Sequence, residues 1–269
     1  WVDLMSEEGK YIYCIIDTNS EEEKLGPIGI GGRGDEVYTV RYRDIAAVIS
    51  NTSVMKYPVD RPSTIAHQRV MEKAMEDHTI LPVRFDTVAE SKKKEGKVVE
   101  TDIERIRRQV LKNRYLEFKK LLEEMRGKRE LGVKGIWKDM DAIFAEILKE
   151  NQQIAILNKQ LLKRPPTQTQ AERVKLGEMV YKALNEKKAK ESEKILSILK
   201  RLAVDFRQNK NFGDKMFMNY AFLVPAEREQ EFDDVIGELN TSYNDRMRLK
   251  YVGPIPPCNF VEIVVTWED

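Results

Sequence analysis

The stretch Tyr-Val-Gly-Pro-Ile-Pro-Pro-Cys-Asn-Phe-Val, residues 251–261, is the most informative part of this chain for its fold. Three prolines lie within positions 254–257. Each fixes φ at about −65° and removes a backbone donor, so neither a helix nor a central strand can pass through them. Residues 249–252 before this corner and 260–266 after it have the composition of strands. The sequence therefore predicts a rigid corner between two extended segments near the C-terminus.

Hydrophobic patterning in the first half of the chain predicts a mixture of strands and helices. Apolar runs of strand length indicate the strands, and apolar residues at three- and four-residue spacing indicate the helices. Strands are expected at 10–16, 36–42, 45–50 and 80–88, and helices from Ser63 and over 101–125. Gly127 ends the last helix and a basic Lys128-Arg129 pair follows. We therefore expect one domain over residues 1–127 and a second over 128–269.

The second half begins with a strand, which is followed by two long helices and then by further strands and a helix. Strands are expected at 131–137, 216–224, 248–252 and 260–267, and helices at 139–163, 171–206 and 227–243. Pro165-Pro166 separates the first two helices, which we expect to pack as an antiparallel hairpin. Between Asn185 and Lys194 the apolar stripe gives way to Lys and Glu. The middle of the second helix should therefore be solvated on most sides.

The order of elements predicts the fold class. Both halves resemble ferredoxin-like arrangements, in which helices cover one face of an antiparallel sheet. The predicted fold is α+β, with two domains that are each an antiparallel sheet covered by helices, ferredoxin-like or modified ferredoxin-like. The second domain carries the long helical hairpin and ends in the proline-cornered strand segment.

The composition narrows the classes of function. Over 269 residues, Lys plus Arg number 46 and Asp plus Glu number 45, giving a net charge of +1. This balance argues against a dedicated nucleic-acid binder. No apolar run approaches the roughly 18 residues of a membrane-spanning helix. Cys14 and Cys258 are too few for a disulfide framework, and both lie in apolar surroundings, so we expect buried, reduced thiols and a cytoplasmic protein.

Motifs that would carry chemistry are weak in this sequence. Residues 29–34 spell G-x-G-x-x-G, but a strand is expected to follow, whereas a dinucleotide site needs a helix N-terminus there. His67 and His78 lack the short spacing of zinc ligands. We expect both to pack or to cap their helix, with His78 acting on its last carbonyl groups. No catalytic, cofactor-binding or metal-binding residues are assigned.

Two strings of sequence resemble the gas vesicle GvpL/GvpF family. Residues 80–88 read Ile-Leu-Pro-Val-Arg-Phe-Asp-Thr-Val, where the family carries Pro-x-Arg-Phe-Gly-Thr-Val, and residues 251–261 are similar to Gly-Pro-x-Pro-Pro-Tyr-x-Phe. The similarity also covers residues 31–34, 38–50 and 130–139 in the same order. Asp86 stands where glycine is usual, so we expect that the backbone there does not require a positive φ. Cys258 stands where an aromatic residue is usual.

The resemblance implies an accessory protein required for gas vesicle formation, cytoplasmic and associated with the gas vesicle. The implied partners are the hydrophobic shell protein GvpA and other gas vesicle accessory proteins, with no nucleic acid, no membrane, no cofactor and no enzymatic activity. The candidate partner-binding residues lie in the two strings and are Arg84, Pro254, Ile255, Pro256, Pro257 and Phe260. Arg84 has apolar neighbours, so we expect it to be half-buried against an acidic or carbonyl partner.

A shell subunit with large apolar faces and strand edges aggregates unless it is covered before assembly. We hypothesise that open sheet edges of this chain cap such a subunit by adding strands, and that the proline corner sets where pairing stops. Two alternatives stay open: a small-ligand-binding regulatory module and an enzyme on a ferredoxin-like scaffold. A ligand-binding module predicts a pocket between the domains with inward polar groups. Assembly predicts exposed apolar patches or open sheet edges.

Overall fold

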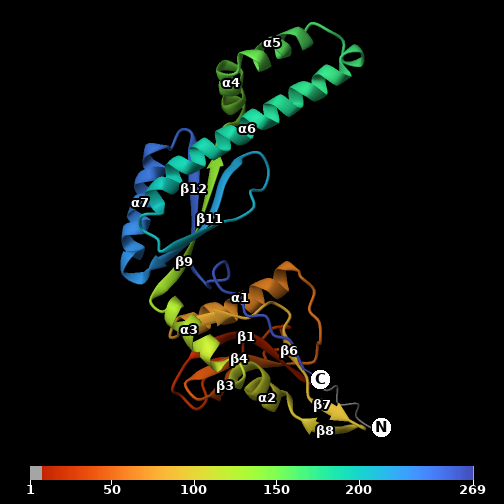
Figure 1. Ribbon diagram of the computed structural model, residues 1–269, viewed down its shortest axis with the longest axis vertical. Coiled ribbons are helices and arrows are strands. Elements are labelled where there is room, and N and C mark those ends of the chain that lie inside the picture. Colours follow the sequence, from red (N-terminus) through yellow and green to blue (C-terminus); the bar gives the residue numbers. More distant parts are fainter. Residues whose placement is uncertain (1–7, 269) are drawn as a thin grey trace. The chain divides into compact units, whose positions relative to one another are not determined.

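The computed structural model describes residues 8–268 and divides into two compact units (Figure 1). The first unit comprises the chain up to Arg129 and again from Pro254 onward, and the second is Glu130–Gly253. The predicted second domain, 128–269, differs from this division at its C-terminal end. Val261 and Ile263 belong to the core of the first unit, so the last residues of the chain return to the unit in which it began.

An antiparallel sheet of six strands forms the centre of the first unit. Its strands follow the spatial order β2-β3-β4-β1-β5, and β6 also pairs with β1. The strands are β1 (Gly9–Asp17), β2 (Lys24–Gly26), β3 (Val37–Tyr42), β4 (Ile45–Thr52), β5 (Ile80–Pro82) and β6 (Val88–Ala89). The predicted strand 80–88 is therefore two short strands, and the loop between them forms part of the site described below.

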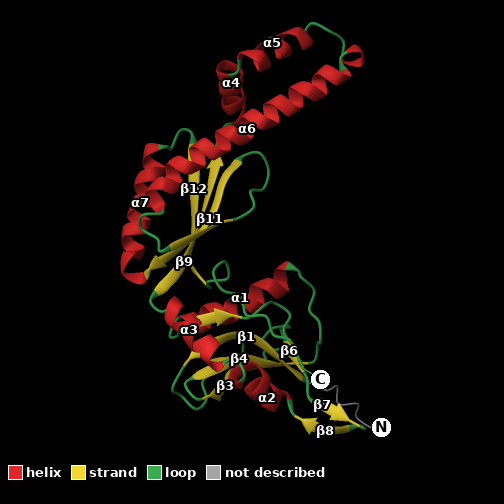
Figure 2. Ribbon diagram, viewed as in Figure 1, coloured by secondary structure: helices red, strands yellow, loops and turns green. Residues whose placement is uncertain are grey.

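Helices cover both faces of this sheet (Figure 2). α1 (Arg61–Met75) packs on the face that carries Tyr11, and α3 (Tyr115–Met125) packs on the face that carries Ile12. Successive residues of a strand point to opposite faces, so β1 and β4 are buried along almost their whole length. The expectation that helices cover only one face is wrong for this unit.

The predicted helix 101–125 consists of three consecutive segments. These are α2 (Asp102–Arg105), the π-helix η1 (Ile106–Lys112) and α3. Thr101 and Glu104 form a reciprocal capping box: the Thr101 hydroxyl accepts from the Glu104 N–H at 3.3 Å, and the Glu104 carboxylate accepts from the Thr101 N–H at 2.8 Å. Single π-helical turns frequently accompany functional sites. Gln109 of η1 accepts a hydrogen bond from the Glu268 N–H, so η1 lies beside the C-terminal residues of the chain.

A short hairpin precedes these helices. β7 (Lys92–Lys94) pairs with β8 (Lys97–Glu100) as a two-stranded sheet of its own. Glu95 and Gly96 join the strands with φ of 52° and 77°. Two consecutive residues with positive φ are typical of the tight turn whose twist matches that of a hairpin.

The second unit has the ferredoxin-like order of elements. Its elements are β9 (Lys128–Trp137), α4 (Met140–Glu150), α5 (Gln152–Leu161), α6 (Gln170–Leu199), β10 (Asp205–Gln208), β11 (Met216–Pro225), α7 (Glu229–Ser242) and β12 (Met247–Ile255). The strands are arranged as β10-β11-β9-β12, so the first strand of the unit lies between the third and the fourth. The predicted α+β class, with antiparallel sheets and helices, is confirmed.

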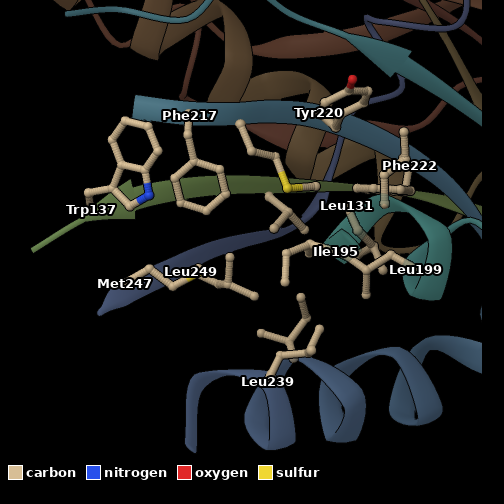
Figure 3. Close-up of a cluster of buried hydrophobic side chains, with 14 of the residues drawn as sticks. Leu131, Trp137, Ile195, Leu199, Phe217, Tyr220, Phe222, Leu239, Met247 and Leu249 are labelled. Atoms are coloured by element: carbon tan, nitrogen blue, oxygen red, sulfur yellow. The ribbon is translucent and has the colours of Figure 1, made fainter. Parts of the chain in front are cut away.

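The core of the second unit lies between its sheet and helices α6 and α7 (Figure 3). The rings of Trp137 and Phe217 stack with their centroids 5.4 Å apart. A Cβ atom on Gly135 would lie 2.4 Å from the Phe217 ring, so only glycine leaves room for that ring on β9. Ile195 and Leu199 reach this core from α6, and Leu239 reaches it from α7.

A helical hairpin made of α4, α5 and the first half of α6 extends beyond the sheet of the second unit (Figure 1). The helix predicted over 139–163 is interrupted at Asn151, which has extended φ and ψ of −123° and 92°. The Asn151 side chain donates to the Ile147 carbonyl at 2.9 Å and satisfies the end of α4. The helix predicted to reach residue 206 ends at Leu199, and β10 begins at Asp205 after a turn.

Charged side chains hold the base of this hairpin together. Arg246 donates to both carboxylate oxygens of Glu146, at 2.5 and 2.9 Å, and also bonds Glu191. Trp137 Nε1 donates to Glu191 at 2.5 Å, and Lys187 lies 2.8 Å from Glu146. The Arg246 hydrogen bonds hold the pKa of Glu146 at about 2. Residues 185–194 of α6 were expected to be solvated on most sides. In this stretch, Lys187 and Glu191 form ion pairs in place of apolar packing.

Candidate interaction site in the first unit

A hollow of about 600 Å³ lies in the first unit beside the loop between β5 and β6. Its lining includes Met55, Arg84, Asp86, Arg105, Val264 and Trp267. The structure thus places Arg84, a predicted site residue, beside residues of the C-terminal segment. The first of the two family strings therefore lines the hollow, together with residues that follow the second string in the sequence.

Hydrogen bonds hold the backbone of the loop between β5 and β6. The Val83 N–H donates to the Tyr13 carbonyl at 2.9 Å, and the Arg84 N–H donates to the Ile263 carbonyl at 2.9 Å. The Thr87 hydroxyl donates to the Arg84 carbonyl at 2.6 Å. Both backbone groups of Arg84 are therefore satisfied, and its position in the wall of the hollow is fixed.

The Arg84 side chain differs from its expected state. It is exposed, and it forms no hydrogen bond or ion pair with any residue between 8 and 268. The expectation of a half-buried guanidinium with an acidic or carbonyl partner is wrong. A fixed backbone with an unpaired guanidinium is suited to binding a group from outside the chain.

Asp86 adopts a conformation that favours glycine. Its φ is +66°, so the expectation that this position does not require a positive φ is also wrong. The left-handed region costs about 1 kcal/mol for a residue with a Cβ atom. Two hydrogen bonds offset that cost: the Asp86 N–H donates to the Tyr11 hydroxyl at 2.9 Å, and Asp86 Oδ1 accepts from the Tyr57 N–H at 2.6 Å.

A buried cluster of aromatic residues supports this loop from below. The Tyr11 hydroxyl lies 3.1 Å from His67 Nδ1, and the His67 ring lies edge-on to Phe85 with centroids 5.6 Å apart. Burial raises the pKa of Tyr11 and lowers the pKa of His67 to about 4. His67 is therefore a neutral core residue, in agreement with the prediction that it packs. No pattern in the sequence indicates that Tyr11 and His67 support the loop.

The second histidine lies at another edge of the sheet. His78 Nδ1 lies 2.9 Å from the Asp17 carbonyl, and Nε2 lies 2.8 Å from a carboxylate oxygen of Glu23. The prediction that His78 acts on the last carbonyl groups of its own helix is wrong. It connects the end of α1 to the end of β1 and to the loop that precedes β2.

The proline corner supports the fold of the first unit. Pro254 and Ile255 are half-buried at the end of β12, an edge strand, where a missing N–H is tolerated. Pro256 and Pro257 are buried, and the N–H groups of Phe260 and Val261 both donate to the Pro257 carbonyl at 3.0 Å. Phe260 itself is half-buried. The predicted strand before the corner extends to Ile255, and the corner itself is a tight turn.

The predicted strand 260–267 is reduced to one bridge. Ile263 pairs with Val83 in parallel, and its N–H donates to the Pro82 carbonyl at 2.8 Å. Elsewhere the segment is held by side chains: the Gln109 amide bonds both backbone groups of Glu268, at 3.0 and 3.3 Å. Side-chain anchoring of this kind leaves no periodic signal in the sequence, which explains why it was not predicted.

Arg105 is the second cation in the lining of the hollow. Its Cζ lies 4.9 Å from the centroid of the Trp267 ring, and its Nη1 donates to the Glu90 carbonyl at 2.9 Å. Its Nε is buried without a hydrogen-bond partner in the described chain. The aromatic face stabilises the guanidinium in place of a carboxylate. Neither Arg84 nor Arg105 forms an ion pair with the described residues, so both charges are available in this hollow.

Side chains cap one residue on each edge strand of the second unit's sheet. On β12, the Leu249 N–H donates to Asn240 Oδ1 at 2.8 Å, and Asn240 Nδ2 donates to the Leu249 carbonyl at 3.1 Å. On β10, the Phe206 N–H donates to Asp205 at 2.8 Å, and Arg207 donates to the Phe206 carbonyl at 3.2 Å. Such capping disfavours pairing with another chain at Leu249 and Phe206, and the expectation of open edges stays a prediction for the rest of β12 and β10.

The described residues carry little that indicates covalent chemistry. Between residues 8 and 268, no three His, Cys, Asp or Glu side chains lie close enough together to hold a metal ion. Burial raises the pKa of the Cys14 thiol, which disfavours the nucleophilic thiolate. Cys258 is exposed, so the expectation that both cysteines are buried is wrong for this residue. Across the same residues, each helix is too short or too polar to cross a membrane.

Comparisons with known proteins agree with the resemblance seen in the two strings. The chain is 24% identical over 265 residues to gas vesicle protein F1 of Halobacterium salinarum, covering 97% of each chain. The crystal structure of the gas vesicle protein GvpF from Anabaena sp. PCC7120 is similar in fold, with a TM-score of 0.76 and 24% identity over 95% of this chain and 99% of that one. GvpF from Microcystis aeruginosa gives a TM-score of 0.71 at 22% identity, with the same coverage. The family model for the gas vesicle synthesis protein GvpL/GvpF matches residues 9–262, and the chain belongs to this family.

Proposed function

We propose that this chain is an accessory protein of gas vesicle formation that binds the shell protein GvpA and other gas vesicle proteins. The match to the gas vesicle synthesis family over residues 9–262 supports a role in gas vesicle formation. The proposal places the protein in the cytoplasm, in association with the gas vesicle. It assigns the protein no enzymatic activity and no cofactor, so that its action is binding alone.

The observation that carries the proposed contact is the state of Arg84. Its backbone is fixed by Ile263 and Thr87, whereas its guanidinium is exposed and unpaired. Met55 and Val264, 41% and 42% exposed, add apolar surface to the same hollow. A partner segment that combines a carboxylate or carbonyl group with an apolar side chain fits this lining.

The residues of the proline corner have a different part in this proposal. Pro256 and Pro257 are buried, so they hold the turn that directs the last residues of the chain toward the hollow. Pro254, Ile255 and Phe260 are half-buried and contribute only the surface that they leave accessible. Asn240 and Asp205 each cap one residue of an edge strand, so strand addition would use the other residues of β12 and β10.

Co-purification of this chain with co-expressed GvpA tests the contact. Arg84→Ala should leave the melting temperature unchanged, because the side chain has no internal partner, and should reduce the recovered GvpA about tenfold. Arg84→Lys keeps the charge and loses the planar guanidinium, so it should recover part of the binding. Arg69→Ala removes another exposed arginine, from α1, and should bind like the wild type. Equal recovery of GvpA by the Arg84→Ala variant would exclude this site.

A small-ligand-binding regulatory module is the second candidate, favoured by the volume of the hollow. About 600 Å³ falls within the range of small-molecule sites. The hollow lies within the first unit, whereas the sequence-based alternative placed a pocket between domains. A thermal-shift screen of carboxylates and nucleotides distinguishes the two candidates. A ligand that raises the melting temperature of the wild type but not of Arg84→Ala would favour the regulatory module.

A further inference from the structure

The end of the helical hairpin is strongly positive. Residues 152–182 contain six Lys or Arg against two Asp or Glu, whereas the totals of the whole chain, 46 and 45, nearly cancel. Its exposed lysines form no ion pair with the residues that the structure describes. These are Lys159, Lys163, Lys175 and Lys182. A local excess of unpaired cations attracts a negatively charged partner surface.

Apolar side chains are exposed beside these lysines. Val174 is 59% exposed and Tyr181 is 66% exposed on α6. They are seven residues apart, as are Lys175 and Lys182. Residues at this spacing lie on one side of a helix, so an apolar row and a basic row run side by side. Exposed apolar residues rimmed by charge are typical of protein interaction surfaces.

The opposite charge is concentrated on α7 of the same unit. Residues 226–239 contain six Asp or Glu against one Arg. Glu231, Asp234 and Glu238 are exposed, and their spacing of three and four residues places them on one face of the helix. Phe232 and Ile236 are buried in the core on the other face. The acidic face therefore points to solvent.

The basic tip and α7 lie toward opposite ends of α6 (Figure 1), so they cannot meet within one molecule. We propose that the hairpin tip of one copy of this chain docks on α7 of a second copy. Lys175 and Lys182 span the same seven residues as Glu231 and Glu238, about 10 Å along each helix, so both charge pairs can form together once Glu231 shares its carboxylate between the lysine and Arg228. Two different surfaces meet, which makes the contact heterologous and generates a ring or an open chain of copies.

Exchange of charges between the two surfaces tests this contact directly. The tip variant carries Lys163→Glu, Lys175→Glu and Lys182→Glu, and the helix variant carries Glu231→Lys, Asp234→Lys and Glu238→Lys. All six side chains are exposed, so both variants should fold. Sedimentation velocity of the full chain at about 10–200 µM and about 50 mM salt reports self-association.

The wild type should associate, and each variant alone should associate at least about tenfold more weakly. An equimolar mixture of the two variants should associate again, because each negative tip then meets a positive helix. A control with Lys92→Glu, Lys94→Glu and Lys97→Glu makes the same charge change on the β7–β8 hairpin and should behave like the wild type. A monomeric wild type, a mixture that stays dissociated or a control that dissociates would each overturn the proposal. None of these outcomes depends on GvpA.

Discussion

Ile263 pairs in parallel with Val83, and this contact joins the string at residues 80–88 to the segment that follows the proline corner. Ile263 is 1% exposed and Val83 is 2% exposed. The bridge lies where the chain, after crossing the second unit, returns to the first. It positions Arg84, whose N–H donates to the Ile263 carbonyl. The last residues of the chain are therefore part of the wall that presents the proposed contact.

Truncation of the Ile263 side chain should weaken the contact between the C-terminal segment and the rest of the first unit. Ile263→Ala removes a buried side chain and should lower the free energy of unfolding by about 3 kcal/mol. Urea unfolding followed by circular dichroism measures the change. Val264→Ala is the matched control: its side chain is 42% exposed, so the free energy should change by less than about 0.5 kcal/mol. Equal effects of the two substitutions would mean that the segment is not anchored through Ile263.

Substitutions of Asp86 separate backbone strain from side-chain bonding. Asp86→Ala keeps the Cβ atom at φ of +66° and loses the bond from the Tyr57 N–H, so it should lower the free energy of unfolding by about 2 kcal/mol. Asp86→Gly loses the same bond but removes the strain, and should cost about 1 kcal/mol less. Chemical denaturation of the wild type, Asp86→Ala and Asp86→Gly gives the order of their free energies of unfolding. An alanine variant as stable as the glycine variant would show that the positive φ is not strained.

The buried His67 predicts a loss of stability in acid. Its pKa is about 4 in the folded chain and about 6.5 when unfolded. Folding thus favours the neutral form, so the stabilisation is complete above pH 6.5 and declines as the pH falls toward 4. The decline should reach about 3 kcal/mol. In His67→Gln the slope between these pH values should flatten, and an unchanged slope would assign it to other groups.

Arg246 should be more important than an ordinary surface arginine. Arg246→Met leaves Glu146 and Glu191 without their shared cation and should lower the free energy of unfolding by about 2 kcal/mol at pH 7. Because the pKa of Glu146 is lowered from 4.5 to about 2, this stabilisation is present above pH 4.5 and is lost as the pH falls toward 2. Arg228→Met breaks an exposed pair with Glu231 and should change the free energy of unfolding much less than Arg246→Met does.

Removal of an edge cap should promote association. Asn240→Ala frees both backbone groups of Leu249 on β12, and an unpaired edge pairs with other chains. Light scattering at elevated temperature should show earlier aggregation than in the wild type. Asn244→Ala removes an amide that contacts only the exposed Lys138 and should not change aggregation. Identical curves for the two variants would show that the side chain of Asn240 does not protect this edge.

The apolar patterns predicted the positions of the strands and helices better than the way in which these elements stack in layers. The runs at Tyr11 to Ile16 and Ile45 to Ile49 were correctly identified as strands. Continuous apolar runs, rather than alternating ones, also indicate strands buried on both faces, and the helices on both sides of the first sheet agree with this. Asn151 interrupts a helix through its own side-chain bond to Ile147, a local competition that periodicity does not reveal.

The site was predictable only in its position along the chain. Family resemblance drew attention to Arg84, but no pattern indicated that its side chain is unpaired, because this depends on residues far away in sequence. The return of the C-terminal residues was hidden for the same reason: Gln109 and Glu268, which are 159 positions apart, bond through one amide. Non-local contacts between single residues leave no periodicity from which to infer them.

The order of synthesis gives the returning C-terminus a further consequence. A ribosome delivers Glu130–Gly253 in full before the residues that complete the first unit have been made. The first unit therefore stays incomplete on the nascent chain, with the neighbours of Val83 uncovered. All residues of the second unit are already present, so this unit can fold first. A transcript that stops a dozen codons early would yield a molecule whose second half is sound and whose first half never matures.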